Sequence, residues 1–180
     1  MNKVFKLKLV ILLALAIIIL SIFLSIRANS SEVVELPNCS LKYSVETTAS
    51  KSTIWKLWTD VENWKQFDTI LEYSYLVDDA YFELGAIGYI NANGAPKTKF
   101  EIVELKEPES FTLSLKLPLW QTMELQRYYE ENEFGYTTFT HEVNFKGGLR
   151  HIYYALLAST FKKELINVME NLKEIAERDE

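Results

Sequence analysis

Arg127 and His141 are the residues whose types and positions most strongly suggest binding chemistry. Arg127 lies on the apolar face of the strand-like run 123–129, and His141 lies on the apolar face of the run 139–145. A turn-like stretch, Asn132–Gly135, joins the two runs, so we expect Arg127 and His141 to be direct or diagonal neighbours across a hairpin. Because a buried arginine is costly unless it is paired, the two side chains could present donors to a ligand's carboxylate, phosphate or carbonyl group.

The alternative is that this pair is purely structural. Arg127 would then be satisfied by Glu124, by Glu142 or by a carboxylate of the C-terminal helix, or a bulge would turn it to solvent. His141 as a general acid or base would need a partner that fixes its tautomer, and the sequence shows none. With two histidines and one cysteine in the chain, no metal site is expected, and no nucleotide-binding or hydrolase motif indicates a cofactor.

The element that must position these residues is the segment His151–Glu177, which has the apolar periodicity of an amphipathic helix. At about 1.5 Å per residue it would be a rod of roughly 40 Å, which needs a surface to lie on. The apolar stripe consists of Ile152, Tyr153, Leu156, Leu157, Thr160, Phe161, Leu165, Val168, Met169, Leu172 and Ile175.

The preceding chain supplies that surface as six or seven strand-like runs. Ser50 or Ser52 can cap a short helix that reaches Val61, and residues 63–67 form a second short helix or bend. The pattern predicts an α+β domain in which a curved antiparallel sheet grips the last helix. The runs are 39–48, 70–77 (with Leu71, Tyr73, Tyr75 and Val77 on one face), 86–91, 97–105, 111–117, 123–129 and 139–145.

The stretch Ser50–Asp68 resembles the opening signature of the SRPBCC superfamily (START-like; polyketide cyclase/dehydrase and lipid transport). In that signature an apolar-aromatic pair leads to an Asp and then to aromatics spaced like Trp64 and Phe67. The resemblance covers about residues 40–177. It implies the helix-grip fold, a seven-stranded sheet whose first strand pairs with the last, and an apolar cavity under the C-terminal helix.

Inward-facing side chains would line that cavity, although a filled core is the default alternative. Four of the candidates are tyrosines whose hydroxyl groups could reach a ligand. The full candidate set is Tyr73, Tyr75, Phe100, Leu113, Leu115, Met123, Leu125, Arg127, Tyr129, Phe139, His141, Tyr153, Leu157 and Phe161.

Residues 1–30 are expected to be a membrane anchor or a signal segment, followed by a linker, 31–38, and a domain, 39–180. The apolar run Leu9–Ile26 would reach about 27 Å as a helix, close to the hydrocarbon thickness of a bilayer. Lysines before this run place the N-terminus inside and the domain outside the cytoplasm. The alternative is a secreted or periplasmic protein, cleaved near Ser30.

The domain is acidic, because all 25 acidic residues lie at or after Glu32, so a nucleic-acid partner is not expected. Its Pro118–Trp120 connection is unusual in being apolar. By strand alternation it should share one rim of the sheet with Asn93–Gly94 and Gly147–Gly148, and the linker should enter there. Leu119 and Trp120 then either dip into a bilayer or fold back as a lid over the cavity.

Three hypotheses follow for function. The first is an anchored or exported module that binds a lipid or another hydrophobic small molecule. The second is an enzyme of the polyketide cyclase or aromatase type that uses the same cavity. The third is a scaffold with a filled core that acts through protein contacts.

Overall fold

The computed structural model describes residues 32–131 and 137–179. The expected anchor or signal segment, 1–30, and the turn Asn132–Gly135 lie outside these residues. No helix in the two described ranges has the length and apolar character needed to cross a membrane.

In chain order the elements are β1 (Val34–Leu36), β2 (Ser40–Thr47), α2 (Lys51–Thr59), η1 (Val61–Gln66), β3 (Leu71–Leu76), η2 (Val77–Asp79), β4 (Ile87–Ala92), β5 (Thr98–Lys106), β6 (Ser110–Leu117), β7 (Gln121–Glu131), β8 (Thr137–Lys146) and α3 (Arg150–Arg178).

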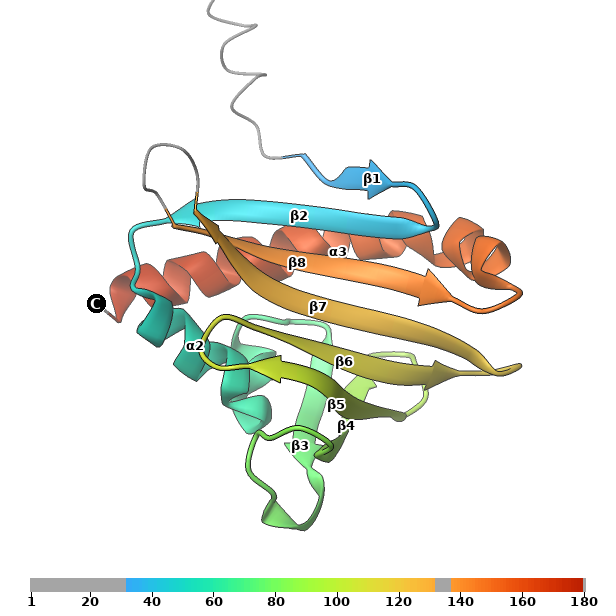
Figure 1. Cartoon of the computed structure of the whole chain (residues 1–180), viewed down its shortest axis with the longest axis horizontal. Coiled ribbons are helices and arrows are strands. Elements are labelled where there is room, and N and C mark those ends of the chain that lie inside the picture. Colours follow the sequence, from blue (N-terminus) through green and yellow to red (C-terminus); the bar gives the residue numbers. More distant parts are fainter. Residues whose placement is uncertain (1–31, 132–136, 180) are drawn as a thin grey trace, which may run out of the picture. The chain divides into compact units, whose positions relative to one another are not determined.

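Over the described residues the strands form one antiparallel eight-stranded sheet in the order β1-β2-β8-β7-β6-β5-β4-β3. The sheet is curved, and α3 lies across one of its faces (Figure 1). This confirms the expected α+β architecture, including the pairing of β2 with β8. The expected number of seven strands was wrong, because Val34–Leu36 of the expected linker pairs with β2 as a further edge strand. Three residues are too few to show an alternating pattern.

Strand register places three connections on one edge of the sheet, here called the hairpin rim: Asn93–Gly94, Pro118–Trp120 and Gly147–Gly148. This agrees with the expected alternation of connections. The linker joins β2 at this rim, as expected, because Ser40 pairs with Asn144. Within the linker, β1 begins opposite Lys42 and runs towards the rim.

β3 contains a register shift between Leu71 and Tyr73. Such a bulge adds a residue and reverses which side chains face the core. Ser74 is therefore buried, whereas Tyr73 is 41% exposed and Tyr75 meets Lys97 on the outer face. The expectation that Tyr73 and Tyr75 face inward was wrong for this reason.

The start of α3 is fixed to the start of β7 by the buried side chain of Gln121. Its Oε1 accepts from the backbone N–H of Leu149 (2.7 Å), and its Nε2 donates to the carbonyl of Leu119 (2.8 Å). Beyond its first two turns α3 packs against β2 and β8. The first two turns are less covered: Ile152 and Leu156 are 55% and 70% exposed, so their expected burial was wrong.

The concave face of the sheet is divided into a filled half and a hollow half. Beneath α2 the ring of Trp58 meets those of Tyr129 (4.9 Å), Phe111 (5.9 Å) and Phe139 (6.2 Å), and these rings fill the core. In the other half of the concave face, the space over β4–β7 is not filled by α3, because α3 packs on β2 and β8. That space is the cavity described below.

Gly88 of β4 lies under the ring of its cross-strand partner Phe100, which also lines the cavity. A Cβ at this position would overlap the Phe100 ring and stand 2.7 Å from the carbonyl oxygen of Tyr75. We expect Gly88→Ala to lower the free energy of unfolding by about 1–3 kcal/mol, measured by urea denaturation. Gly148→Ala is the control, since nothing lies near its Cβ position; equal stability of the two variants would contradict the close approach.

Candidate functional site

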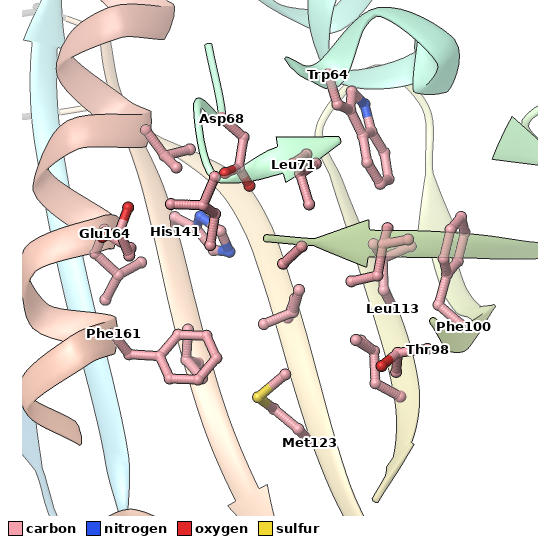
Figure 2. Close-up of a pocket in the computed structure, with 18 of the residues that line it drawn as sticks. Trp64, Asp68, Leu71, Thr98, Phe100, Leu113, Met123, His141, Phe161 and Glu164 are labelled. Carbon is pink, nitrogen blue, oxygen red and sulfur yellow. The ribbon is translucent and has the colours of Figure 1, made fainter. Parts of the chain in front are cut away.

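A cavity of about 190 Å³ lies between strands β4–β8 and α3. One end is polar: Asp68, His141 and Glu164 gather there in Figure 2, and Arg127 also lines the cavity. Apart from Thr98, the other walls are apolar. They consist of Trp64, Ile70, Leu71, Ile90, Ala92, Ala95, Phe100, Leu113, Leu115, Leu117, Met123, Leu125, Val143, Phe161, Leu165 and Val168.

The structure brings eight of the fourteen expected cavity residues together: Phe100, Leu113, Leu115, Met123, Leu125, Arg127, His141 and Phe161. The other six lie elsewhere. Tyr73 and Tyr75 are on the outer face, and Tyr129 and Phe139 belong to the filled core beneath α2. Tyr153 and Leu157 lie on the first turns of α3, where the hydroxyl of Tyr153 donates to the carbonyl of Pro118 (3.1 Å).

Arg127 and His141 are direct cross-strand partners, as expected, and both are buried, with 4% and 6% exposure. Register runs unbroken through this hairpin, so no bulge turns Arg127 to solvent. The expected acidic partners on neighbouring positions are engaged elsewhere. Glu124 pairs with Lys146 (2.5 Å), and Glu142 accepts from the hydroxyl of Tyr128 (3.2 Å).

The guanidinium of Arg127 is held by aromatic rings. Its Cζ lies 5.3 Å from the ring centre of Trp64, 5.5 Å from that of Phe67 and 5.8 Å from that of Phe111. Cation–π attraction of this kind strengthens when the cation is desolvated. The rings fix the position of the guanidinium while leaving its Nη1 without a hydrogen-bond partner among the described residues.

Burial controls the ionisation of the polar end. It raises the pKa of Asp68 to about 6, although the positive charge of Arg127 opposes this. Burial also lowers the pKa of Arg127 to about 10, with Asp68 acting in the opposite direction. Burial, followed by repulsion from Arg127, holds the pKa of His141 well below its ordinary value, so its imidazole is neutral at pH 7.

The sequence analysis missed Asp68 and Glu164 as site residues, although a signal existed for each. Asp68 directly follows Phe67, the second residue of the aromatic pair near the end of the stretch Ser50–Asp68. Glu164 lies three residues after Phe161 and four before Val168, which is the helical spacing of the buried stripe.

A second polar pair lies away from the cavity, where the Sγ of Cys39 is 3.0 Å from Nδ1 of His151. In the described part of the chain no third side chain joins them as a metal ligand. More generally, no three His, Cys, Asp or Glu side chains within residues 32–131 and 137–179 are placed to hold a metal ion.

Comparison with known proteins finds similar solved structures. No family model matches the sequence, and no curated protein matches it. Among solved structures, protein Ms6760 from Mycobacterium smegmatis is similar with a TM-score of 0.58 and 15% identity, over 83% of this chain and 99% of that one. The major latex-like protein 151 of Panax ginseng has a TM-score of 0.52 and 12% identity, over 76% and 96%.

A third similar structure is the di-domain ARO/CYC StfQ from the steffimycin biosynthetic pathway. It has a TM-score of 0.61 and 9% identity, over 78% of this chain and 51% of that one. Identities this low carry information on fold alone. The likeness, together with the sheet order and the position of α3, identifies the fold as helix-grip.

Proposed function

We propose that this protein binds a small hydrophobic molecule in the cavity between β4–β8 and α3. The observation that carries the proposal is the combination of apolar walls with buried polar atoms that have no partner among the described residues: Nη1 of Arg127, Oδ1 of Asp68 and both ring nitrogens of His141. Unpartnered buried polar groups are costly. A ligand that supplied their hydrogen bonds would recover that free energy.

The volume of the cavity limits the size of the guest. A protein cavity of about 150 Å³ lined by apolar side chains holds one benzene molecule. At about 190 Å³ the cavity fits a single ring with a few substituent atoms. A longer lipid chain would require the sheet and α3 to move apart.

Native mass spectrometry of the full chain, purified in a mild detergent, tests the proposal. We expect a co-purifying small molecule in the natural protein and its loss in Val143→Phe, which fills the cavity from β8. Val45→Phe is the matched control, since Val45 is a buried valine of the adjacent β2 outside the cavity. If Val45→Phe loses the molecule and Val143→Phe keeps it, the cavity is not its binding site.

The polar end also favours a second candidate, an enzyme of the polyketide cyclase or aromatase type. A carboxyl group with a pKa of about 6, in the same cavity as a neutral imidazole, could exchange protons with a substrate near neutral pH. This hypothesis predicts that a poly-β-ketothioester loses the mass of water in the presence of the protein. His141→Ala would abolish that conversion while leaving the circular dichroism unchanged; the binding hypothesis predicts no conversion by either protein.

Membrane anchoring through Leu9–Ile26 is part of the proposal, with export and cleavage near Ser30 as the alternative. The hairpin rim supports it. Leu119 and Trp120 are 62% and 94% exposed, with positive φ angles of 56° and 57° that hold both side chains outward at the tip. This exposure favours the membrane interpretation of Trp120 over a lid on the cavity. A tryptophan so placed is suited to a membrane interface.

Fluorescence of the full chain in lipid vesicles tests the position of Trp120. Brominated lipids quench tryptophan at the interface. Of the other three tryptophans, Trp58 and Trp64 are buried in the domain and Trp55 is half-buried. We expect quenching of the natural protein to fall by more than half in Trp120→Ala. Equal quenching of the two proteins would show that Trp120 does not reach the bilayer.

A further inference from the structure

The polar end of the cavity carries more negative than positive charge. Arg127 from β7 supplies the positive charge, whereas Asp68, after η1, and Glu164, on α3, supply two carboxyl groups. His141 from β8 is neutral. Figure 2 draws Asp68, His141 and Glu164 in the same part of the cavity, with Glu164 on the helix. A carboxylate or phosphate entering here would meet two like charges and one opposite charge.

The polar end offers both hydrogen-bond donors and acceptors. Arg127 Nη1 is a donor and Asp68 Oδ1 is an acceptor, and a neutral imidazole has one nitrogen of each kind. Although they attract one another, Arg127 and Asp68 form no ion pair within 4 Å in the described part of the chain. A polar group of a ligand could therefore bridge the two, accepting from the guanidinium and donating to the carboxyl.

The position of the Arg127 guanidinium is fixed by the aromatic rings around it. The rings of Trp64, Phe67 and Phe111 surround it at 5.3–5.8 Å. Its side chain is also fully within the core, with 4% exposure. Recognition at this end is therefore by a fixed set of donors and acceptors, which discriminates strongly against a group that leaves them unpartnered.

We propose that the cavity selects an uncharged, single-ring molecule that bears a hydroxyl or amide group, and rejects a carboxylate of the same size. This inference rests on the proposed function and deepens it. It differs from what Arg127 and His141 alone would suggest, because two donors without Asp68 and Glu164 would favour an anion.

A matched set of probes tests the inference: benzamide, phenol, toluene and benzoate, each titrated into the full chain in detergent at pH 7.5 and followed by NMR. The four molecules share one ring and differ in the polar group. We expect benzamide and phenol to bind at least tenfold more tightly than benzoate, with toluene between them. Benzoate binding as tightly as benzamide would overturn the inference and leave the proposed function standing, whereas the failure of all four to bind would overturn the proposed function itself.

Variants show which side chains set the preference. In Asp68→Asn/Glu164→Gln the positive charge of Arg127 is unopposed, so we expect the benzoate-to-benzamide affinity ratio to rise at least tenfold. Glu62→Gln/Glu174→Gln is the control, since it removes two exposed carboxylates and should leave the ratio unchanged. Glu164→Gln alone, a half-buried position more tolerant of change, should raise the ratio at least threefold. An unchanged ratio in the carboxyl variants would show that these groups do not select the ligand.

Discussion

Arg127→Met is expected to lower the free energy of unfolding by about 2 kcal/mol at pH 7.5, the scale of a cation–π interaction with a desolvated cation. Methionine keeps most of the length of the side chain but loses the cation between the rings of Trp64, Phe67 and Phe111. It also removes the positive charge of Arg127, which favours the ionised form of the half-buried Asp68 carboxyl. Urea denaturation of the full chain in detergent, followed by tryptophan fluorescence, measures the change.

The same substitution at an exposed arginine serves as the control. Arg178→Met, at the end of α3, should change stability by less than about 0.5 kcal/mol. At pH 5 the effect of Arg127→Met should shrink, because Asp68 is then protonated and no longer needs a counter-charge. If Arg127→Met costs under about 1 kcal/mol at pH 7.5, the cation–π contacts of the guanidinium do not stabilise the fold.

The second large effect is a change in how stability depends on pH when Asp68 is replaced by Asn. Burial raises the pKa of Asp68 from 3.8 to about 6 in the folded protein, so the folded state holds this proton more tightly than the unfolded chain does. The stability that this proton provides is fully present below pH 4 and is lost as the pH rises through 6. One pKa unit corresponds to about 1.4 kcal/mol, so the loss is about 3 kcal/mol between pH 4 and pH 8.

Asn cannot titrate, so the stability of Asp68→Asn relative to the natural protein should rise by about 3 kcal/mol from pH 4 to pH 8. The comparison is needed because other groups face the same site. Arg127 from β7 and Glu164 from α3 carry charge there, and His141 from β8, with its lowered pKa, contributes stability above pH 6.5 that is lost in acid. A stability difference that stays constant from pH 4 to pH 8 would show that Asp68 is not desolvated in the folded protein.

The architecture was predictable because long segments with regular apolar spacing indicate their secondary structure directly. The stripe from Phe161 to Ile175 and the clean alternation of β6 specify a helix and a strand whatever their surroundings. Ser50 accepts a hydrogen bond from the backbone N–H of Thr53 (3.2 Å), as expected of a capping residue. The pairing of Arg127 with His141 followed from counting back from a turn.

The remaining errors have local causes that sequence periodicity cannot show. The bulge after Leu71 reversed the faces of Tyr73 and Tyr75, and a bulge leaves no distinctive residue pattern. The exposure of Ile152 and Leu156 depends on where α3 leaves the sheet. The division of the concave face into a filled core and a cavity depends on how α3 packs, which is a property of the assembled layers.

The two missed carboxyl groups have a different cause. Asp68 and Glu164 were passed over because acidic residues are usually solvated. Their positions next to aromatic and aliphatic residues were visible in the sequence. These positions predicted their location at the cavity better than their charge did. An acidic residue at helical spacing within an apolar stripe should be examined as a candidate site residue.

NMR of the methionine methyl groups tests the central claim most directly, because the chain places one methionine in the cavity and one outside it. Met123 lines the cavity. Met169, on α3, is fully buried in the hydrophobic core and does not line the cavity. On titration of benzamide into the full chain labelled at the methionine methyl groups, we predict a saturable shift of the Met123 signal and an unchanged Met169 signal. The Met123 shift should disappear in Val143→Phe and persist in Val45→Phe. A Met123 signal that does not move at saturating benzamide, or that moves equally in both variants, would contradict a ligand-binding cavity beneath α3.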